Sequence, residues 1–208
     1  MPNNEIVLEN TPPMAELGLI PHKSCTAIAE RVNDYLLKWR QERKSDQSII
    51  TLAGYRSDSY IVEADCPRFG SGEAKGIINQ SVRGLDLYIL VDVTNYSLTY
   101  TVCGHENHMS PDDIFCDLKR LIAAAMGKAK RITVITPFLY EGRQHRRSAR
   151  ESLDCAMALQ ELINMGVDNI ITFDAHDPRV QNAIPLYSFE TVSPTYQFLK
   201  GILRTART

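Results

Sequence analysis

The spacing of apolar positions in the first half of the chain predicts one helix and one buried strand. Apolar side chains recur every three or four residues over 24–44, as on one face of a helix, and Ser24 or Thr26 can cap its start. Residues 85–93 are almost continuously apolar, which is typical of a strand covered on both faces. Residues 1–23 show no sustained periodicity and contain several prolines, so we expect an extended arm there.

The second half of the chain alternates between strand and helix patterns. Ser110-Pro111 and two following acids suit the start of a helix, and Gly127 suits its end. In chain order, the elements that we expect are helix 110–126, strand 131–137, helix 151–166, strand 167–174, strand 184–189 and a helix that begins at Pro194. Two short β-type runs, 48–52 and 59–64, precede the buried strand.

This alternation places the chain in the α/β class. Strands that alternate with helices form a mostly parallel sheet with helices on both faces, so we expect a three-layer α/β/α domain. We assign residues 48–208 to this domain and residues 1–47 to an N-terminal arm with its amphipathic helix. A chain of 208 residues is long enough to bury a core of its own.

Composition and charge narrow the classes of partner. The chain is 44% apolar and 23% charged with a net charge of −2, a balance that gives no reason to expect nucleic-acid or membrane partners. Its five cysteines are scattered and odd in number, which argues against a disulfide framework and for a reducing compartment. No signal-peptide pattern and no long apolar run is present. We therefore expect a soluble, cytoplasmic protein.

Polar and charged side chains follow two strands of the central βαβ unit, at the point where each strand ends. Residues 142–147 (GRQHRR) leave the first strand, and Asp174, His176 and Asp177 follow the second. In an open parallel sheet, ligands bind in the crevice beyond the carboxyl ends of the strands. Arginines and imidazoles gathered at such an edge predict a site for phosphate groups and a divalent metal.

Each of these residues also has a less specific interpretation. Arg143 and Gln144 offer a guanidinium fork for phosphate oxygens and an amide for a base or ribose, but basic runs are often only exposed loops. The imidazole of His176 can ligate a metal, with Asp174 or Asp177 orienting it, but such a turn can also simply satisfy backbone groups. The pairing of the two stretches at neighbouring strand ends favours the binding interpretation.

Two further stretches contain residue types that bind ligands. Three glycines in 69–76 predict a loop whose backbone can approach a ligand or partner closely. Cys103, His105 and His108 superficially resemble a metal clamp, but they lack the paired-ligand spacing of structural zinc. We therefore interpret residues 94–109 as a polar loop that lies over the carboxyl edge of the sheet.

Together these segments resemble the amino-terminal half of ribose-phosphate pyrophosphokinases, also called phosphoribosyl pyrophosphate synthetases. In chain order, the resemblance rests on PRFGSGEAKGIINQSVRG at 67–84, LDLYILV at 85–91, KAKRITVITPFLYEGRQHRR at 128–147, TFDAHDP at 172–178 and IPLYSFETVSPTYQFLKGIL at 184–203. It covers about two thirds of the chain. Its most specific part is Arg-Gln after a Pro-aromatic strand end, followed about thirty residues later by Asp-x-His.

The resemblance implies a fold, an activity and a set of binding residues. The fold is a type I phosphoribosyltransferase-like N-terminal domain. The activity is the Mg²⁺-dependent transfer of the β,γ-diphosphate of ATP to the 1-hydroxyl of ribose 5-phosphate. Arg143 and Gln144 would contact ATP, and His176 would ligate the magnesium that bridges its phosphates. Arg143 and His176 are therefore the expected catalytic residues.

The resemblance also assigns a role to the glycine-rich loop. Phe69 would stack on adenine, and Ser71, Gly72 and Glu73 would contact the base or the ribose. In the family this loop reaches into the site of the neighbouring subunit. The resemblance therefore implies a homo-oligomer associated through residues 69–73.

The chain also departs from the family. Ser71 stands where the family usually has Asp, and His145-Arg146-Arg147 replaces the usual Asp-Arg-Lys. The ribose 5-phosphate site, a second magnesium aspartate and the diphosphate loop, which lie in the family's carboxyl-terminal half, have no counterpart in this sequence. We therefore expect the ATP- and magnesium-binding N-terminal domain of a ribose-phosphate diphosphokinase, inactive alone. The alternative is a non-catalytic regulatory or scaffold subunit that associates with a true synthetase.

Overall fold

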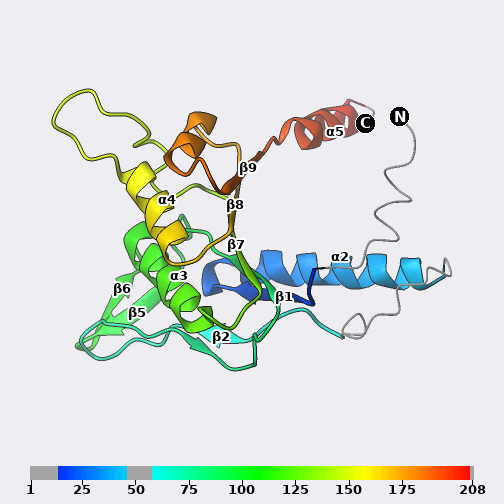
Figure 1. The fold of residues 1–208 in the computed structure, drawn as a ribbon, viewed down its shortest axis with the longest axis horizontal. Coiled ribbons are helices and arrows are strands. Elements are labelled where there is room, and N and C mark those ends of the chain that lie inside the picture. The colour runs from blue at the N-terminus through cyan, green and yellow to red at the C-terminus, as the bar shows by residue number, and fades with distance from the viewer. Residues whose placement is uncertain (1–13, 46–57, 207–208) are drawn as a thin grey trace.

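The structure is a computed structural model that describes residues 14–45 and 58–206 (Figure 1). In the first half of the chain the elements are β1 (Leu17–Pro21), η1 (Lys23–Cys25), α2 (Thr26–Ser45), β2 (Ala64–Asp65), β3 (Ile77–Ile78), β4 (Asp86–Leu90), β5 (Thr99–Val102) and β6 (His105–His108). In the second half they are α3 (Pro111–Ala125), β7 (Arg131–Thr136), α4 (Asp154–Asn164), β8 (Asn169–Phe173), η2 (Pro178–Ala183), β9 (Ser188–Val192) and α5 (Thr195–Thr205).

Five strands form one parallel sheet in the order β1-β4-β7-β8-β9. Every neighbouring pair is parallel, and the register places Thr136 of β7 beside Thr172 of β8. Helices α3 and α4 cover one face and α2 covers part of the other, whereas α5 projects away from the sheet (Figure 1). The predicted α/β class and the mostly parallel, three-layer arrangement are confirmed.

Alternate residues of β4 supply the cores on the two faces of the sheet. Leu87 and Ile89 are fully buried in the larger apolar cluster, which includes Leu118 of α3. Leu90 belongs to a smaller cluster on the opposite face, together with Ala29 of α2. Because side chains alternate across a strand, an unbroken apolar run is what a strand between two helical layers requires.

The path between β1 and β4 reverses the direction in which the chain winds. After α2, Ile61 pairs in parallel with Leu19 of β1. The amide of Leu19 donates to the carbonyl of Tyr60, and the amide of Val62 donates to the carbonyl of Leu19, both at 2.8 Å. The chain then returns through β2 and β3 to β4 and continues to β7, β8 and β9. Right-handed crossovers in opposite directions place their helices on opposite faces. The topological switch point therefore lies between β1 and β4.

Helix α3 begins and ends as the sequence predicts. The Ser110 hydroxyl accepts from the amide of Asp113 (3.1 Å), and the Asp113 carboxylate accepts from the amide of Ser110 (2.9 Å), which completes a capping box. Gly127, just past the last turn, has a φ of 70°. Within the described residues, no helix combines the length and the apolarity needed to cross a membrane.

The expected extended arm is wrong over residues 17–21, which form β1 of the sheet. The three central residues of this strand are buried, and Ile20 is completely inaccessible to solvent. A Cβ on Gly18 would lie 2.8 Å from Cδ1 of Leu85, so the glycine permits close packing against the segment that leads into β4. The strand is only five residues long and ends in proline, which explains why its sequence pattern is weak.

Two predicted elements in the second half begin later than expected. Helix α4 begins at Asp154 rather than at residue 151, and its N-cap residue Leu153 provides no side-chain hydrogen bond. The last strand is 188–192 rather than 184–189, because Ile184 ends η2 and is buried in the core. A buried apolar residue at the end of a 3-10 helix has the same sequence pattern as the first residue of a strand.

Other local predictions were also imprecise. The predicted helix over 24–44 is confirmed as α2. The short η1 precedes it, and His22 is the N-cap of η1, with its ring accepting from the amide of Ser24. Residues 94–109 contain the β5–β6 hairpin rather than an irregular loop. The run 59–64 makes one isolated bridge to β1 before β2, and the run 48–52 lies outside the described residues.

Candidate functional site

The loop that follows β7 is folded by two consecutive turns. The amide of Gly142 donates to the carbonyl of Leu139 (3.0 Å), and the amide of Gln144 donates to the carbonyl of Glu141 (2.8 Å). Glu141 has a φ of 55°, in the left-handed region that few residues other than glycine adopt. These turns carry Arg143 and Gln144 to the surface, where both are exposed.

The base of this loop is anchored to α3. The ring of Tyr140 stacks on Phe115 with centroids 4.1 Å apart, and its hydroxyl donates to a carboxylate oxygen of Asp112 (2.7 Å). Burial and then the bond to Asp112 raise the pKa of the Tyr140 hydroxyl. Burial and then the nearby charge of Asp154 raise the pKa of the Glu141 carboxyl. The residues just before Arg143 are thus fixed by packing.

The turn after β8 is held by β9. The amide of Asp174 donates to the carbonyl of Val192 (3.1 Å), and the amide of Ala175 donates to the hydroxyl of Thr191 (2.9 Å). Asp174 has a φ of 47°, so the chain turns sharply at the strand end. His176 follows this turn and is exposed beyond the carboxyl end of the strand.

The structure brings the two predicted stretches together. The rings of His145 and His176 meet edge to face with centroids 5.3 Å apart. Nε2 of His145 lies 3.5 Å from a carboxylate oxygen of Asp177. Since Arg143 and Gln144 directly precede His145, the β7 loop and the β8 turn form one surface at the carboxyl edge of the sheet.

Asp177 organises the acidic side of this surface. Its carboxylate accepts two hydrogen bonds from the guanidinium of Arg179, from Nε (2.9 Å) and from NH2 (2.6 Å), and a third from the backbone amide of Arg179 (2.9 Å). The side-chain bond from Arg179 is the main reason that the pKa of Asp177 lies well below its usual range. Asp177 is therefore ionised at neutral pH and attracts the ring of His145.

The resemblance implies that His176, at this edge, ligates a magnesium ion. Among the described residues, no group of three His, Cys, Asp or Glu side chains is close enough to enclose a metal ion. Mg²⁺ commonly keeps several waters and takes the rest of its ligands from one or two carboxylates and substrate phosphates. His176 offers one exposed imidazole nitrogen, so most ligands of such an ion would be oxygens of water and phosphate.

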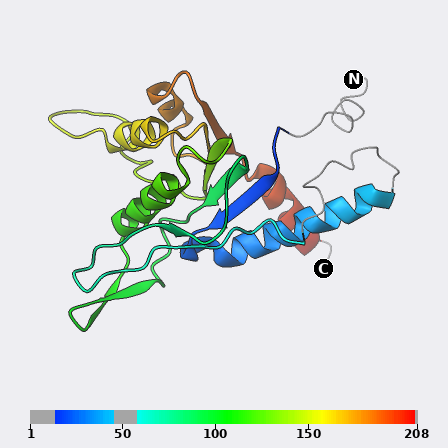
Figure 2. The same cartoon turned by 60° about the horizontal axis from the view of Figure 1, so that its bottom comes forward.

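The loop expected to contact adenine lies elsewhere on the chain. Two backbone hydrogen bonds close this loop: the amide of Gly72 donates to the carbonyl of Phe69 (2.9 Å), and the amide of Phe69 donates to the carbonyl of Glu73 (2.7 Å). The hydroxyl of Ser71 also donates to the carboxylate of Glu73 (2.9 Å). Phe69 is 51% exposed at this turn. Figures 1 and 2 both show the segment near the β5–β6 hairpin, well away from the loop that follows β7. Within one chain, residues 69–73 therefore do not join Arg143 and His176.

The β5–β6 hairpin supports that loop. The amide of Cys103 donates to the carbonyl of Gly70 (3.4 Å), and a Cβ on Gly72 would lie 3.0 Å from Cγ2 of Val102. Gly72 also has a φ of 90°, so a larger residue there would be strained as well as crowded. The side chains of His105 and His108 are exposed on β6.

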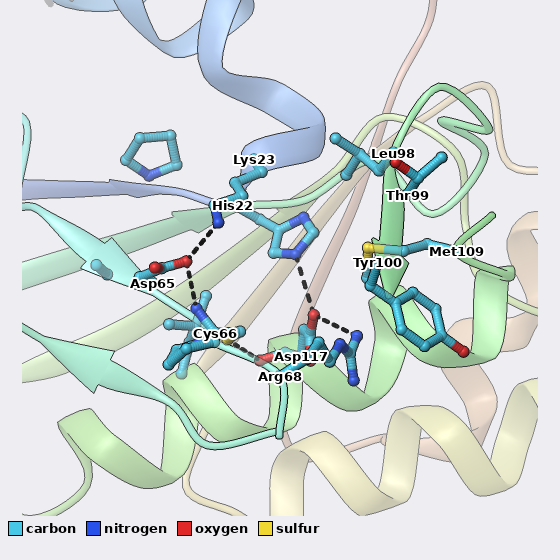
Figure 3. A pocket seen from close by; sticks show the side chains of 14 residues that line it. His22, Lys23, Asp65, Cys66, Arg68, Leu98, Thr99, Tyr100, Met109 and Asp117 are labelled. Carbon is cyan, nitrogen blue, oxygen red and sulfur yellow. Dashed lines mark hydrogen bonds and ion pairs between the residues drawn. The ribbon is translucent and has the colours of Figure 1, made fainter. Parts of the chain in front are cut away.

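A second cluster of ionisable residues was missed in the sequence. Asp117 of α3 is 2% exposed and accepts hydrogen bonds from Arg68 (2.8 Å) and Arg120 (2.7 Å), while Nε2 of His22 lies 3.6 Å away (Figure 3). Asp117, Arg68 and His22 border a cavity of about 120 Å³. An Asp within the apolar stripe of a helix is the pattern that could have revealed it, because such a residue is buried only with partners.

The fold and the strand-end residues define an α/β domain of the parallel-sheet class, with basic and imidazole side chains at the carboxyl edge. A family model described as the N-terminal domain of ribose phosphate pyrophosphokinase matches residues 17–166. The chain belongs to this family.

Individual relatives agree with this assignment. The chain is 28% identical over 143 residues to ribose-phosphate pyrophosphokinase B of Dictyostelium discoideum, covering 68% of the chain and 39% of that relative. It is 31% identical over 121 residues to ribose-phosphate pyrophosphokinase of Vibrio parahaemolyticus, covering 57% and 34% respectively. The crystal structure of phosphoribosylpyrophosphate synthetase from Mycobacterium smegmatis has the same fold, with a TM-score of 0.60, 20% identity, and coverage of 90% of this chain and 51% of that one. The matched part of the chain thus spans about a third to a half of each relative.

Proposed function

We propose that the chain is the ATP- and magnesium-binding N-terminal part of a ribose-phosphate diphosphokinase, which converts ATP and ribose 5-phosphate to phosphoribosyl pyrophosphate and AMP. The observation that supports this most directly is the contact between the β7 loop and the β8 turn, where the rings of His145 and His176 lie 5.3 Å apart. It gathers guanidinium, amide and imidazole groups at one edge of the sheet. The reaction is taken from the relatives, which are ribose-phosphate pyrophosphokinases.

In this proposal the residues of the chain bind and align the nucleotide. Arg143 neutralises phosphate oxygens with its guanidinium fork, and Gln144 contacts the base or ribose. His176 positions the metal through one ring nitrogen. Bound Mg²⁺ supplies further neutralisation of the phosphate charge. Diphosphoryl transfer requires positioning and charge stabilisation rather than a covalent nucleophile, so a site of this composition is sufficient for the nucleotide half of the reaction.

The proposal assigns Phe69 and its loop to the nucleotide site of a neighbouring subunit. Phe69 is half-exposed, and its loop lies far from the connection between β7 and α4 in the same chain (Figure 1). An exposed aromatic ring on a hydrogen-bonded turn is suited to stacking on a base presented by another copy. The active form is then a homo-oligomer associated through residues 69–73.

The nucleotide site can be tested by calorimetric titration of the chain with Mg-ATP. Arg143→Ala should weaken binding about tenfold to a hundredfold, as expected for one lost charge-assisted hydrogen-bonding group. The matched control is Arg83→Ala, which removes an exposed arginine from the amino end of β4. The proposal is wrong if Arg143→Ala binds like the unaltered chain, or if both variants lose affinity equally.

The proposal also states that the chain does not catalyse the full reaction alone. Incubation with ribose 5-phosphate and Mg-ATP should release no AMP. The alternative, a non-catalytic subunit, is favoured by Ser71, which bonds to Glu73 within its own loop. A chain that binds no Mg-ATP, yet elutes with a full-length pyrophosphokinase in size-exclusion chromatography, would establish that alternative.

A further inference from the structure

A cavity of about 120 Å³ lies at the carboxyl end of β1, next to the residues that directly follow this strand (Figure 3). His22 and Lys23 form one part of its wall, and the side chains of Leu98, Tyr100 and Met109 form another. At about 30 Å³ per water, as in the liquid, a cavity of this volume holds roughly four water molecules, so it has room for a small ligand such as an oxyanion.

The ion-pair network at the floor of the cavity has one more arginine than carboxylate. Asp117 and Arg68 line the cavity, and Arg120, which lies outside the lining, also donates to Asp117; the two bonds are 2.8 and 2.7 Å long. The side chain of Arg68 is only 11% exposed, so solvent screens its charge poorly. An incompletely balanced buried charge is unfavourable, and an anion placed beside it would be stabilised.

The orientation of His22 is fixed on both sides. Its Nδ1 accepts from the amide of Ser24 (3.2 Å), which leaves the proton of the neutral ring on Nε2, the nitrogen that faces Asp117. The hydroxyl of Ser24 lies 2.9 Å from the same Nδ1 and accepts from the amide of Asp92 (2.9 Å). The imidazole therefore presents a donor nitrogen to the charged floor of the cavity.

The position of the cavity in the fold also indicates a ligand site. In open α/β sheets, ligands bind beyond the carboxyl ends of the strands at the point where the winding direction reverses. In this chain that point lies between β1 and β4, as the pairing of Leu19 with Ile61 on the far edge of β1 shows. The cavity is built from the residues after β1 and from the hairpin that follows β4. The edge of Arg143 and His176 belongs to a different pair of strands.

We propose that this cavity binds a small metabolite through an oxyanion group, a phosphate or a carboxylate, held by Arg68 and His22. The ion pair of Lys23 with Asp65 (2.8 Å) is partly exposed and lies at the side of the cavity. The apolar part of the ligand packs against the wall formed by Leu98, Met109 and Leu121. This site is independent of the proposed nucleotide site.

The proposal is tested by NMR titration of the labelled 208-residue chain with inorganic phosphate and, separately, with acetate, at constant ionic strength. Saturable shifts of the His22 ring and of the amides around Cys66 are expected at millimolar ligand. Tighter binding of phosphate identifies a phosphate ester as the ligand class, and tighter binding of acetate identifies a carboxylate. The absence of saturable shifts at His22 with both probes overturns the proposal.

Two variants separate occupation of the cavity from general charge effects. Thr99→Trp places a large ring at the exposed edge of the cavity without altering the buried charges, and should weaken binding about tenfold or more. Thr101→Trp is the matched control, since it lies on the same exposed face of β5 but does not line the cavity, and should bind normally. Equal binding by both variants, or shifts confined to residues 143–150, would show that the anion binds elsewhere.

Discussion

Replacing Asp117 with asparagine should strongly destabilise the fold, although the change alters only one oxygen. Asp117 is 2% exposed, and its two carboxylate oxygens accept separately from Arg68 and Arg120. Asparagine retains one acceptor and presents an amide donor to the other guanidinium. It also removes the negative charge that balances two arginines and that lies 3.6 Å from His22.

The expected loss follows from the burial of these partners. Removing one partner of a fully buried ion pair costs about 3–5 kcal/mol, because the remaining charge is left without compensation. The side chain of Arg68 is 11% exposed, but that of Arg120 is 29% exposed, so water offsets part of the loss there. We therefore expect Asp117→Asn to lower the free energy of unfolding by about 3 kcal/mol, a large part of the roughly 5–15 kcal/mol that holds a typical domain folded.

Urea unfolding followed by circular dichroism measures this loss. The matched control is Glu161→Gln, which neutralises a carboxylate that Lys119 contacts at the same short distance of 2.7 Å. Glu161 is 46% exposed, so its removal should cost less than about 1 kcal/mol. If Asp117→Asn destabilises the chain no more than this control does, the cluster is not the compact, desolvated network described above.

Three further substitutions test local features. Gly76→Ala would place a Cβ 2.4 Å from the backbone carbonyl oxygen of Arg120, so we expect a loss of about 3 kcal/mol or more in urea unfolding. Ser110→Ala removes the cap of α3 and should cost about 1 kcal/mol in the same assay. Burial raises the pKa of Glu141 in the folded chain above its usual 4.5, so the ionised form is destabilising; Glu141→Gln should stabilise the fold at neutral pH. That gain should fade as the pH falls through the folded pKa towards 4.5, and a gain that persists below 4.5 would contradict it.

The sequence predicted most reliably those helices and strands whose limits are specified by residues within or next to them. The apolar run at 85–93, the capping sequence at Ser110 and the glycine at 127 each specify a strand or a helix end without reference to the rest of the fold. The approach of the β7 loop to the β8 turn, seen in the contact of His145 with His176, is also predictable, because adjacent parallel strands end at the same edge.

The features that the sequence did not reveal depend on tertiary partners. Strand β1 is only five residues long and has no distinctive sequence pattern. Its pairing with β4 and with Ile61 stabilises it. The burial of His22 beside Asp117 requires β1 and α3 to be brought together, and their positions in the sequence lie far apart. The residues next to His22 and next to Asp117 in the sequence do not predict that these two side chains meet.

Two arguments indicate different ligand sites along the carboxyl edge of the sheet. The reversal of winding indicates the end near β1 and β4, whereas the basic and imidazole side chains indicate the end near β7 and β8. Helices α3 and α4 lie on one face of the sheet, so the fold itself opens no crevice between β7 and β8 (Figure 2). A binding surface there must be built by the long connection between β7 and α4, and the contact of His145 with Asp177 shows how this loop closes on β8. The cavity beside His22, by contrast, follows directly from the reversal of winding at β1. Loss of the His145 contact should therefore disturb the Arg143 surface and leave the cavity unchanged.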